Sequence, residues 1–149
     1  MMGAGKHGGF GNTKGSELSK RFTPVQYEGY VKVKGEIRDV SRRVYQRHDI
    51  DFNYYDAKSK LTNLERMLLG RPPIGNDGNP IVLHHVIQKE SGPMVEIREV
   101  THKEYHKVLH GLVGKNSSFR NDPILDKQYN NFRSAYWIWR AKEYIRGKK

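Results

Sequence analysis

The stretch that decides the fold class is Ile81–His110, which reads IVLHHVIQKESGPMVEIREVTHKEYHKVLH. Residues 81–87 are mostly apolar and predict a buried strand, the polar and glycine-containing residues 88–93 predict a loop, and residues 94–100 predict a second strand. Thr101 with Glu104 has the spacing of a capping box, which predicts a helix from there to Gly111. The order is therefore strand, loop, strand, helix.

This stretch also contains five of the seven histidines of the chain. His106 and His110 are four residues apart, so on a helix their imidazoles lie one turn apart on the same face. Such a pair can bind one small divalent ion, whose nitrogen ligands lie about 2.0–2.1 Å away. His102 and His106 have the same spacing, which leaves both pairs open. His102 and His110 are separated by roughly 12 Å along a helix, too far to share an ion easily.

His84 and His85 are neighbours on the predicted strand, so their side chains should point to opposite faces. Binding of both to one ion would strain the backbone. A division of roles is easier, in which one imidazole binds a metal and the other acts as a general base on a water molecule. A neutral imidazole with a pKa near 6.5 suits that second role.

Helix signals flank the histidine-rich stretch on both sides. Thr62 and Glu65 form a second potential capping box and Gly70 is a suitable residue after a helix, which together predict a helix over residues 63–69. Residues 71–80 contain several prolines, glycines and asparagines and predict a turn-rich connection. Asp122-Pro123 predicts the start of a last helix. Its apolar stripe comprises Leu125, Tyr129, Phe132, Tyr136 and Trp139.

The N-terminal part of the chain predicts strands after a glycine-rich segment. Residues 30–34 alternate apolar with basic side chains, as a half-buried strand does. Residues 37–47 fit a strand better than a helix. Residues 1–26, with six glycines in the first fifteen positions, predict a flexible lead-in or linker, which leaves 27–149 as one domain. The expected fold class is α+β, with an N-terminal β region and flanking helices.

The charge of the chain points to a polyanionic partner. Its 149 residues include 27 Lys and Arg against 16 Asp and Glu, a formal net charge of +11. Nucleic acid is the first expectation, because neutralising phosphates releases condensed counterions. An acidic protein comes second and a membrane surface a weak third. The absence of cysteine excludes disulfides, thiolate nucleophiles and cysteine-ligated zinc, and no apolar run predicts a membrane span or an export signal.

Candidate phosphate contacts lie in two basic segments. Arg42 and Arg43 belong to an arginine-rich segment that could face phosphates, although a solvated charged face is about as good an interpretation. On the last helix, one flank carries Arg133, Trp137 and Arg140, and Lys142 adds to the basic surface. Both tryptophans could instead belong to the core, an interpretation that is favoured for Trp139 and evenly balanced for Trp137.

An ordered set of residues resembles a known nuclease family. The set includes residues 63–80, Leu83-His84-His85, Gln88, Gly92-Pro93, Glu96 and Leu109-His110, with further similarity at residues 39–47 and at Phe132-Arg133 and Tyr136-Trp137. It resembles the LHH group of the HNH/endonuclease VII superfamily, whose members are typically C-terminal domains of bacterial polymorphic toxins. The resemblance implies a ββα-metal finger, which agrees with the strand–strand–helix order.

The resemblance also implies roles for individual residues. The first histidine of the pair, His84, is expected to bind the metal and the second, His85, to be the general base. His106 and His110 are the expected helix ligands, with His102 as an alternative. One divalent ion (Mg²⁺, Mn²⁺, Zn²⁺ or Ni²⁺) is the implied cofactor. Arg66 and Arg133 are candidates for stabilising charge on the phosphate.

The expected function is metal-dependent hydrolysis of DNA, largely without sequence specificity, by a toxin domain. A ribonuclease on the same fold is the alternative, and two further possibilities are a binding module with a structural metal and a basic scaffold without one. A toxin of this kind implies an acidic immunity protein that neutralises it. It also implies delivery as part of a larger secreted protein, with action in the cytoplasm of a target bacterium.

Overall fold

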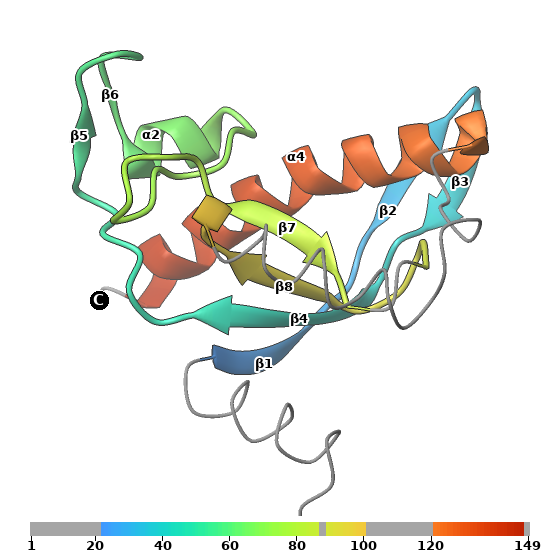
Figure 1. Ribbon diagram of the computed structural model, residues 1–149. Helices are drawn as coiled ribbons and strands as arrows, with labels where there is room; N and C mark the ends of the chain where they lie inside the picture. The colour runs from blue at the N-terminus through green and yellow to red at the C-terminus, as the bar shows by residue number, and fades with distance from the viewer. Residues whose placement is uncertain (1–21, 87–88, 101–120, 148–149) are drawn as a thin grey trace, which may run out of the picture.

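The computed structural model of the chain describes residues 22–86, 89–100 and 121–147, which form a mixed α+β fold (Figure 1). The strands are β1 (Phe22–Tyr27), β2 (Tyr30–Val33), β3 (Glu36–Asp39), β4 (Arg42–Arg47), β5 (Tyr55–Asp56), β6 (Leu61–Thr62), β7 (Val82–His85) and β8 (Met94–Ile97), and the helices are α2 (Asn63–Leu68) and α4 (Pro123–Gly147). The α+β class expected from the sequence is confirmed. No helix in the described part of the chain is long and apolar enough to cross a membrane.

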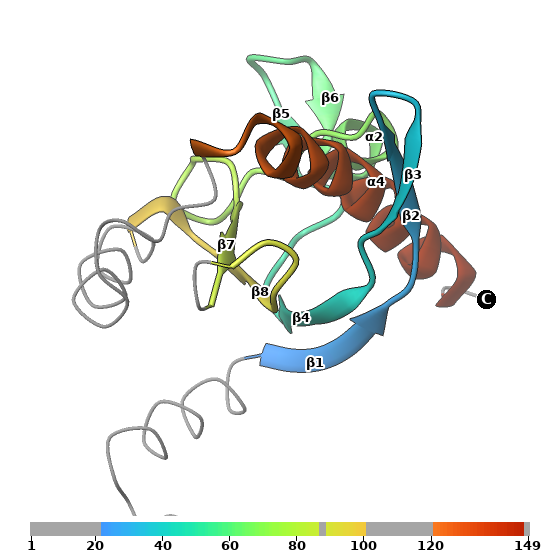
Figure 2. The ribbon, with the colours of Figure 1, turned by 90° about the vertical axis from the view of Figure 1, so that its right-hand side faces the viewer.

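The main sheet has four strands in the order β1-β4-β8-β7 (Figure 2). β1 pairs antiparallel with β4, and β7 pairs antiparallel with β8. The pairing of β4 with β8 is parallel and joins the β1–β4 pair to the strands of the histidine-rich stretch. The sheet therefore places β7, which carries His84 and His85, at one edge.

Helix α4 covers one face of this sheet and supplies much of the core (Figure 2). The Asp122 carboxylate accepts hydrogen bonds from the backbone N–H groups of Ile124 and Leu125, which confirms the predicted cap. Tyr129, Phe132 and Tyr136 of the predicted stripe are buried. Leu125 and Trp139 are only partly buried, and the side chains that complete the buried face of the helix are Gln128, Trp137 and Ala141.

Helix α2 forms as the sequence predicts. The Thr62 hydroxyl accepts from the Glu65 backbone N–H, and the Glu65 carboxylate accepts in turn from the Thr62 N–H. Gly70 follows the helix with a φ of +84°, a conformation that favours glycine. The next residues turn back through Gly78, also at positive φ, and lead into β7. Packing of α2 on α4 fixes this connection beside the main sheet.

Three expected boundaries are corrected by the structure. Residues 22–26, predicted to be the last part of a linker, belong instead to β1, whose pairing with β4 buries Phe22 and Tyr27. The strand expected over residues 37–47 is interrupted at Val40 and Ser41, because β3 pairs with β2 whereas β4 joins the main sheet. The strand expected to reach Val100 ends at Ile97, and residues 99–100 are already helical, before the predicted cap at Thr101.

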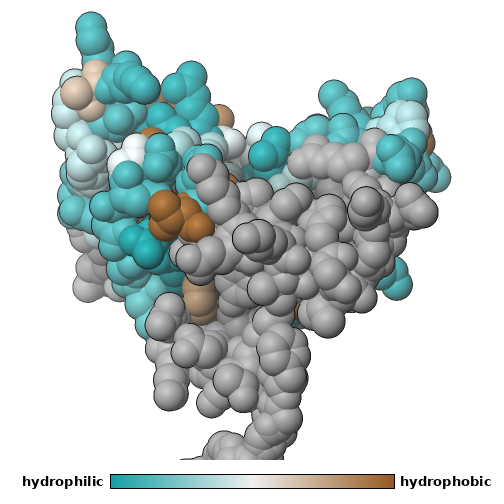
Figure 3. All heavy atoms as spheres, viewed as in Figure 1, coloured by the Kyte–Doolittle hydropathy of each residue, from teal (hydrophilic) through white to brown (hydrophobic). Residues whose placement is uncertain are grey.

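The surface seen from the side of Figure 1 is mostly hydrophilic where the structure describes it (Figure 3). Large apolar side chains that are exposed include Tyr30, Ile37, Tyr55 and Leu69, which belong to the outlying hairpins and the end of α2. These residues lie outside the main sheet, whose apolar face packs against α4 in the core.

Candidate functional site

His84 and His85 point to opposite faces of the main sheet, as predicted. His84 pairs with Val95 of β8, whose side chain belongs to an apolar cluster with Phe22 and Ile97. His85 pairs with Met94, which belongs to the main core beneath α4. Both histidines are buried. The alternation of the strand therefore gives the two imidazoles separate environments, which a division of roles requires.

The His85 side chain is held by a carboxylate that the sequence alone did not single out. Its Nε2 lies 2.8 Å from Oε1 of Glu90, which is in the loop after β7. The imidazole also packs against the Tyr129 ring, with 4.8 Å between the ring centroids. These contacts attach His85 to both the loop and helix α4.

Glu90 is the centre of a buried polar network. Nη1 and Nη2 of Arg42 donate to its two carboxylate oxygens, both at 2.8 Å, and Gln128 Nε2 donates to Oε2 at 2.7 Å. The Arg42 guanidinium lies 3.9 Å above the centre of the Phe132 ring, and its Nε donates to the carbonyl of Val40. The Glu90 side chain thus receives partners from β4, β7 and α4 together, the arrangement that makes a buried charge tolerable.

The network keeps Glu90 ionised. Burial opposes ionisation, but hydrogen bonds from Arg42 and His85, together with the positive charge of Arg42, outweigh it and lower the pKa of Glu90 from 4.5 to about 2. An ionised carboxylate can only accept hydrogen bonds, so Nε2 of His85 must carry the proton in their contact. In a neutral imidazole the basic nitrogen is then Nδ1. The geometry therefore selects one tautomer of His85.

A second buried carboxylate, Glu96 of β8, connects the main sheet to helix α4. It accepts hydrogen bonds from Nε and Nη2 of Arg140, from the Tyr136 hydroxyl and from the backbone N–H of Arg47. Burial and the nearby Glu96 charge raise the pKa of Tyr136 well above its usual value, so its hydroxyl stays a donor. The signal in the sequence was an acid inside the apolar run of residues 94–97.

Four of the residues expected to contact phosphate are largely buried and make contacts within the fold. Arg42 is buried in the Glu90 network, and Arg140 is committed to Glu96. Trp137 is 1% exposed and belongs to the core. Arg66 is 9% exposed, lies 3.5 Å from Asp56 and donates to the carbonyl of Pro72. A pattern of charged residues does not reveal which of them have a buried partner from a distant segment.

The other expected contacts remain on the surface. Arg43, Arg133 and Lys142 are exposed. The Arg133 guanidinium donates to Asn130 at 2.7 Å and lies 4.9 Å from the centre of the Tyr129 ring. Because the same ring packs against His85, Arg133 is the exposed candidate that the structure connects most directly to the histidine pair.

Of the residues expected to bind a metal ion, the structure describes His84. Histidine imidazole is a good ligand for divalent ions, and the buried Nε2 of His84 offers such a donor on the face of β7 opposite His85. Within residues 22–86, 89–100 and 121–147, no three His, Asp or Glu side chains come together around one point. The predicted helix ligands His102, His106 and His110 lie outside the described residues, as does the helix of the predicted ββα finger.

Comparison with known proteins places this arrangement in a family. The family model for LHH, a nuclease of the HNH/endonuclease VII superfamily with a conserved LHH motif, matches residues 62–143. The match runs from the cap of α2 through Leu83-His84-His85 to the last turns of α4, and it covers more than half of the chain. No solved structure matches this fold. This chain, which carries its histidine pair on β7, therefore belongs to the LHH nucleases of the HNH/endonuclease VII superfamily.

Proposed function

We propose that this nuclease is a metal-dependent endonuclease that hydrolyses phosphodiester bonds of DNA, with His85 as the general base and His84 as a metal ligand. The observation that carries the proposal is the contact between His85 and Glu90. An ionised buried carboxylate fixes the orientation of the imidazole and its tautomer, as a general base requires. A histidine that only fills space in the core does not need a contact with a buried ion pair such as Arg42–Glu90.

The expected role of each residue follows from its environment. Nδ1 of His85 would take the proton from the attacking water, while Glu90 stabilises the resulting imidazolium. Arg133 is exposed and close to Tyr129, so it can neutralise charge on a bound phosphate. His84 and the helix histidines would hold the divalent ion, which would supply positive charge to stabilise the phosphate and the leaving oxygen. Nucleases of this superfamily generally use such an ion.

We propose DNA as the substrate. RNA is the alternative, and it would be bound by the same residues. The net charge of +11 supports binding to either polymer through phosphates, which gives affinity without reading the base sequence. Arg43 and Lys142 remain exposed for such contacts. Cleavage largely without sequence preference is therefore expected.

The test is cleavage of plasmid DNA and of total RNA, side by side, in Mg²⁺, Mn²⁺, Ni²⁺, Zn²⁺ or EDTA. We expect nicking of the plasmid with at least one of the four ions and none in EDTA. Cleavage of RNA alone would move the assignment to a ribonuclease. If neither polymer is cut with any ion, the nuclease proposal is wrong for this chain and a nucleic-acid-binding module with a structural metal is the better account.

We also propose that this nuclease is the toxin domain of a larger secreted or delivered protein, which acts in the cytoplasm of a target bacterium. A cell that makes such an enzyme must neutralise it, and the positive surface fits an acidic immunity protein. Mixing the nuclease with the candidate acidic protein should give a complex on gel filtration and should stop DNA cleavage. A mixture that shows neither effect would exclude that pairing.

A further inference from the structure

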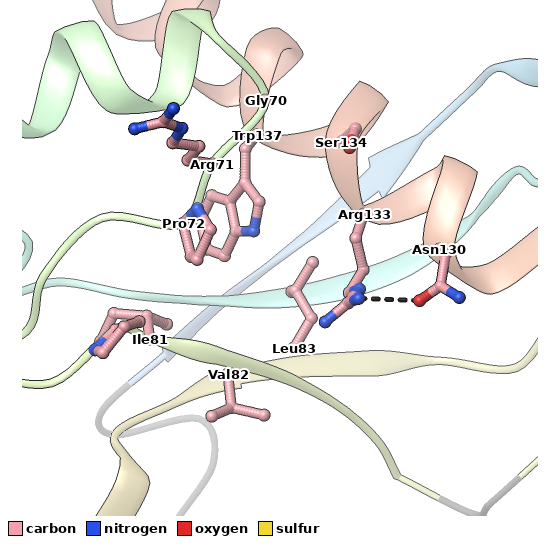
Figure 4. A pocket seen from close by; sticks show the side chains of 11 residues that line it. Gly70, Arg71, Pro72, Ile81, Val82, Leu83, Asn130, Arg133, Ser134 and Trp137 are labelled. Carbon is pink, nitrogen blue, oxygen red and sulfur yellow. Dashed lines mark hydrogen bonds between the residues drawn. The ribbon is translucent and has the colours of Figure 1, made fainter. Parts of the chain in front are cut away.

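A cavity of about 290 Å³ lies between the connection after α2, strand β7 and helix α4 (Figure 4). Its volume is close to the lower limit of the roughly 300–1,000 Å³ typical of small-molecule sites. Arg71 and Pro72 line it from the connection, Leu83 from β7, and Arg133 and Trp137 from α4. The cavity is thus large enough for one small ligand, and three separate elements shape it.

The lining of this cavity combines an apolar wall with two positive charges. Pro72, Pro80 and Val82 contribute its accessible apolar surface, and the buried side chains of Leu83 and Trp137 lie behind it. Arg71 and Arg133 are both exposed, and their guanidinium groups lie on different sides of the Trp137 ring (Figure 4). Arginine side chains have many rotamers, so both groups can turn toward an anion bound in the cavity. Among the described residues that line the cavity there is no Asp or Glu, which would compete with an anion for these arginines. An apolar wall together with two arginines suits a ring that carries a phosphate.

The cavity is adjacent to the histidine pair. Leu83, which lines it, directly precedes His84, and its carbonyl accepts a hydrogen bond of 2.7 Å from the Tyr129 hydroxyl. The ring of Tyr129 contacts the Arg133 guanidinium and also packs against His85. A ligand at Arg133 would therefore be only one aromatic ring away from the proposed general base.

We propose that this cavity, the Arg71–Arg133 pocket, is a subsite for one nucleotide of the substrate strand. The base would lie against the apolar wall, and the phosphate would bind to Arg71 and Arg133. The hydrogen bond from Arg133 to Asn130 orients the guanidinium for this contact. The assignment of the ligand as part of a nucleic acid strand rests on the proposed nuclease function. The subsite extends that function, because it positions the strand beside the cleaved bond and adds Arg71 to the binding residues.

Trp137 allows this pocket to be tested without catalysis. In a Trp139→Phe variant, Trp137 is the single tryptophan of the chain, and its fluorescence reports on the pocket that it lines. We would titrate this variant in EDTA with dAMP, with deoxyadenosine and with inorganic phosphate. Saturable binding of dAMP, tighter than binding of either part, is expected. Arg71→Ala and Arg133→Ala should each weaken it roughly tenfold or more, because each removes a charge-assisted contact.

Lys58→Ala is the matched control, since it removes one exposed positive charge from the β5–β6 connection, outside the pocket. It should leave dAMP binding unchanged. Circular dichroism verifies that every variant is folded. The proposal is overturned if dAMP does not bind, if phosphate alone binds as tightly, or if Lys58→Ala weakens binding as much as Arg133→Ala does. Because these titrations contain no metal, a protein that cuts DNA but fails them would refute the subsite while leaving the nuclease function intact.

Discussion

Replacing His85 with alanine is expected to slow DNA cleavage by roughly 10²–10⁴-fold, the usual contribution of a positioned general base. The His85→Ala variant should still bind its metal ion, because His84 faces the other side of β7. His84→Ala should instead lose metal binding and, with it, cleavage. Plasmid nicking rates and calorimetric titration with Ni²⁺ or Zn²⁺ measure the two properties separately.

The control for these variants is His48→Ala. His48 is exposed and contacts Thr23 at 2.7 Å, outside the candidate site, so its loss should leave cleavage at the wild-type rate. A folded His85→Ala variant that cuts DNA at the wild-type rate would contradict the role of His85. If His85→Ala loses metal binding while His84→Ala retains it, the two roles are exchanged.

The local signals of the sequence predicted the framework of the site well. The capping box at Thr62 and the Asp122-Pro123 pair define helix starts through contacts within a few residues, and both are confirmed. The opposite orientation of His84 and His85 follows from strand geometry alone and is also confirmed. Such features depend on neighbouring residues, which a linear sequence displays directly.

The parts that were missed depend on contacts between distant segments. Arg42 and Glu90 are 48 residues apart, and Arg140 and Glu96 are 44 apart, so nothing in either neighbourhood shows that the charges will pair. The burial of Trp137, rather than Trp139, has the same kind of cause. Helix α4 has apolar residues on more than one flank, and the flank that is buried depends on a sheet formed by other segments of the chain. The buried carboxylate of Glu90, in the loop after the histidine pair, was the missing part of the candidate site.

The Glu90→Gln variant is expected to lower the free energy of unfolding by about 3–5 kcal/mol, because it leaves the Arg42 charge buried without its counter-ion. Arg42 and Glu90 side chains are 1% and 0% exposed, so water cannot replace the lost partner. Glu36→Gln is the matched control. Glu36 pairs with Arg38 at the surface and is 68% exposed, so its loss should cost about 1 kcal/mol or less. Urea denaturation of the three proteins at pH 7 measures the difference.

The loss of stability at acid pH provides a second measurement of the contribution of ionised Glu90. The pKa of Glu90 is depressed in the folded state, to about 2 against an ordinary 4.5, so its ionisation stabilises the fold above pH 4.5. This stabilisation, on the order of 3 kcal/mol, is lost as the pH falls from about 4.5 toward 2. Glu90→Gln cannot titrate at this position, and its stability should therefore fall less steeply over that range.

A double variant separates the cost of an unpaired charge from other effects of the substitution. Arg42→Met together with Glu90→Gln removes both charges, so it should be more stable than Glu90→Gln alone although it carries one change more. Methionine retains an unbranched apolar chain to fill the space above the Phe132 ring. If the double variant is instead less stable than Glu90→Gln alone, Arg42 contributes mainly through packing on Phe132. The Arg42–Glu90 ion pair would then not be the main contact between β4 and the loop that contains Glu90.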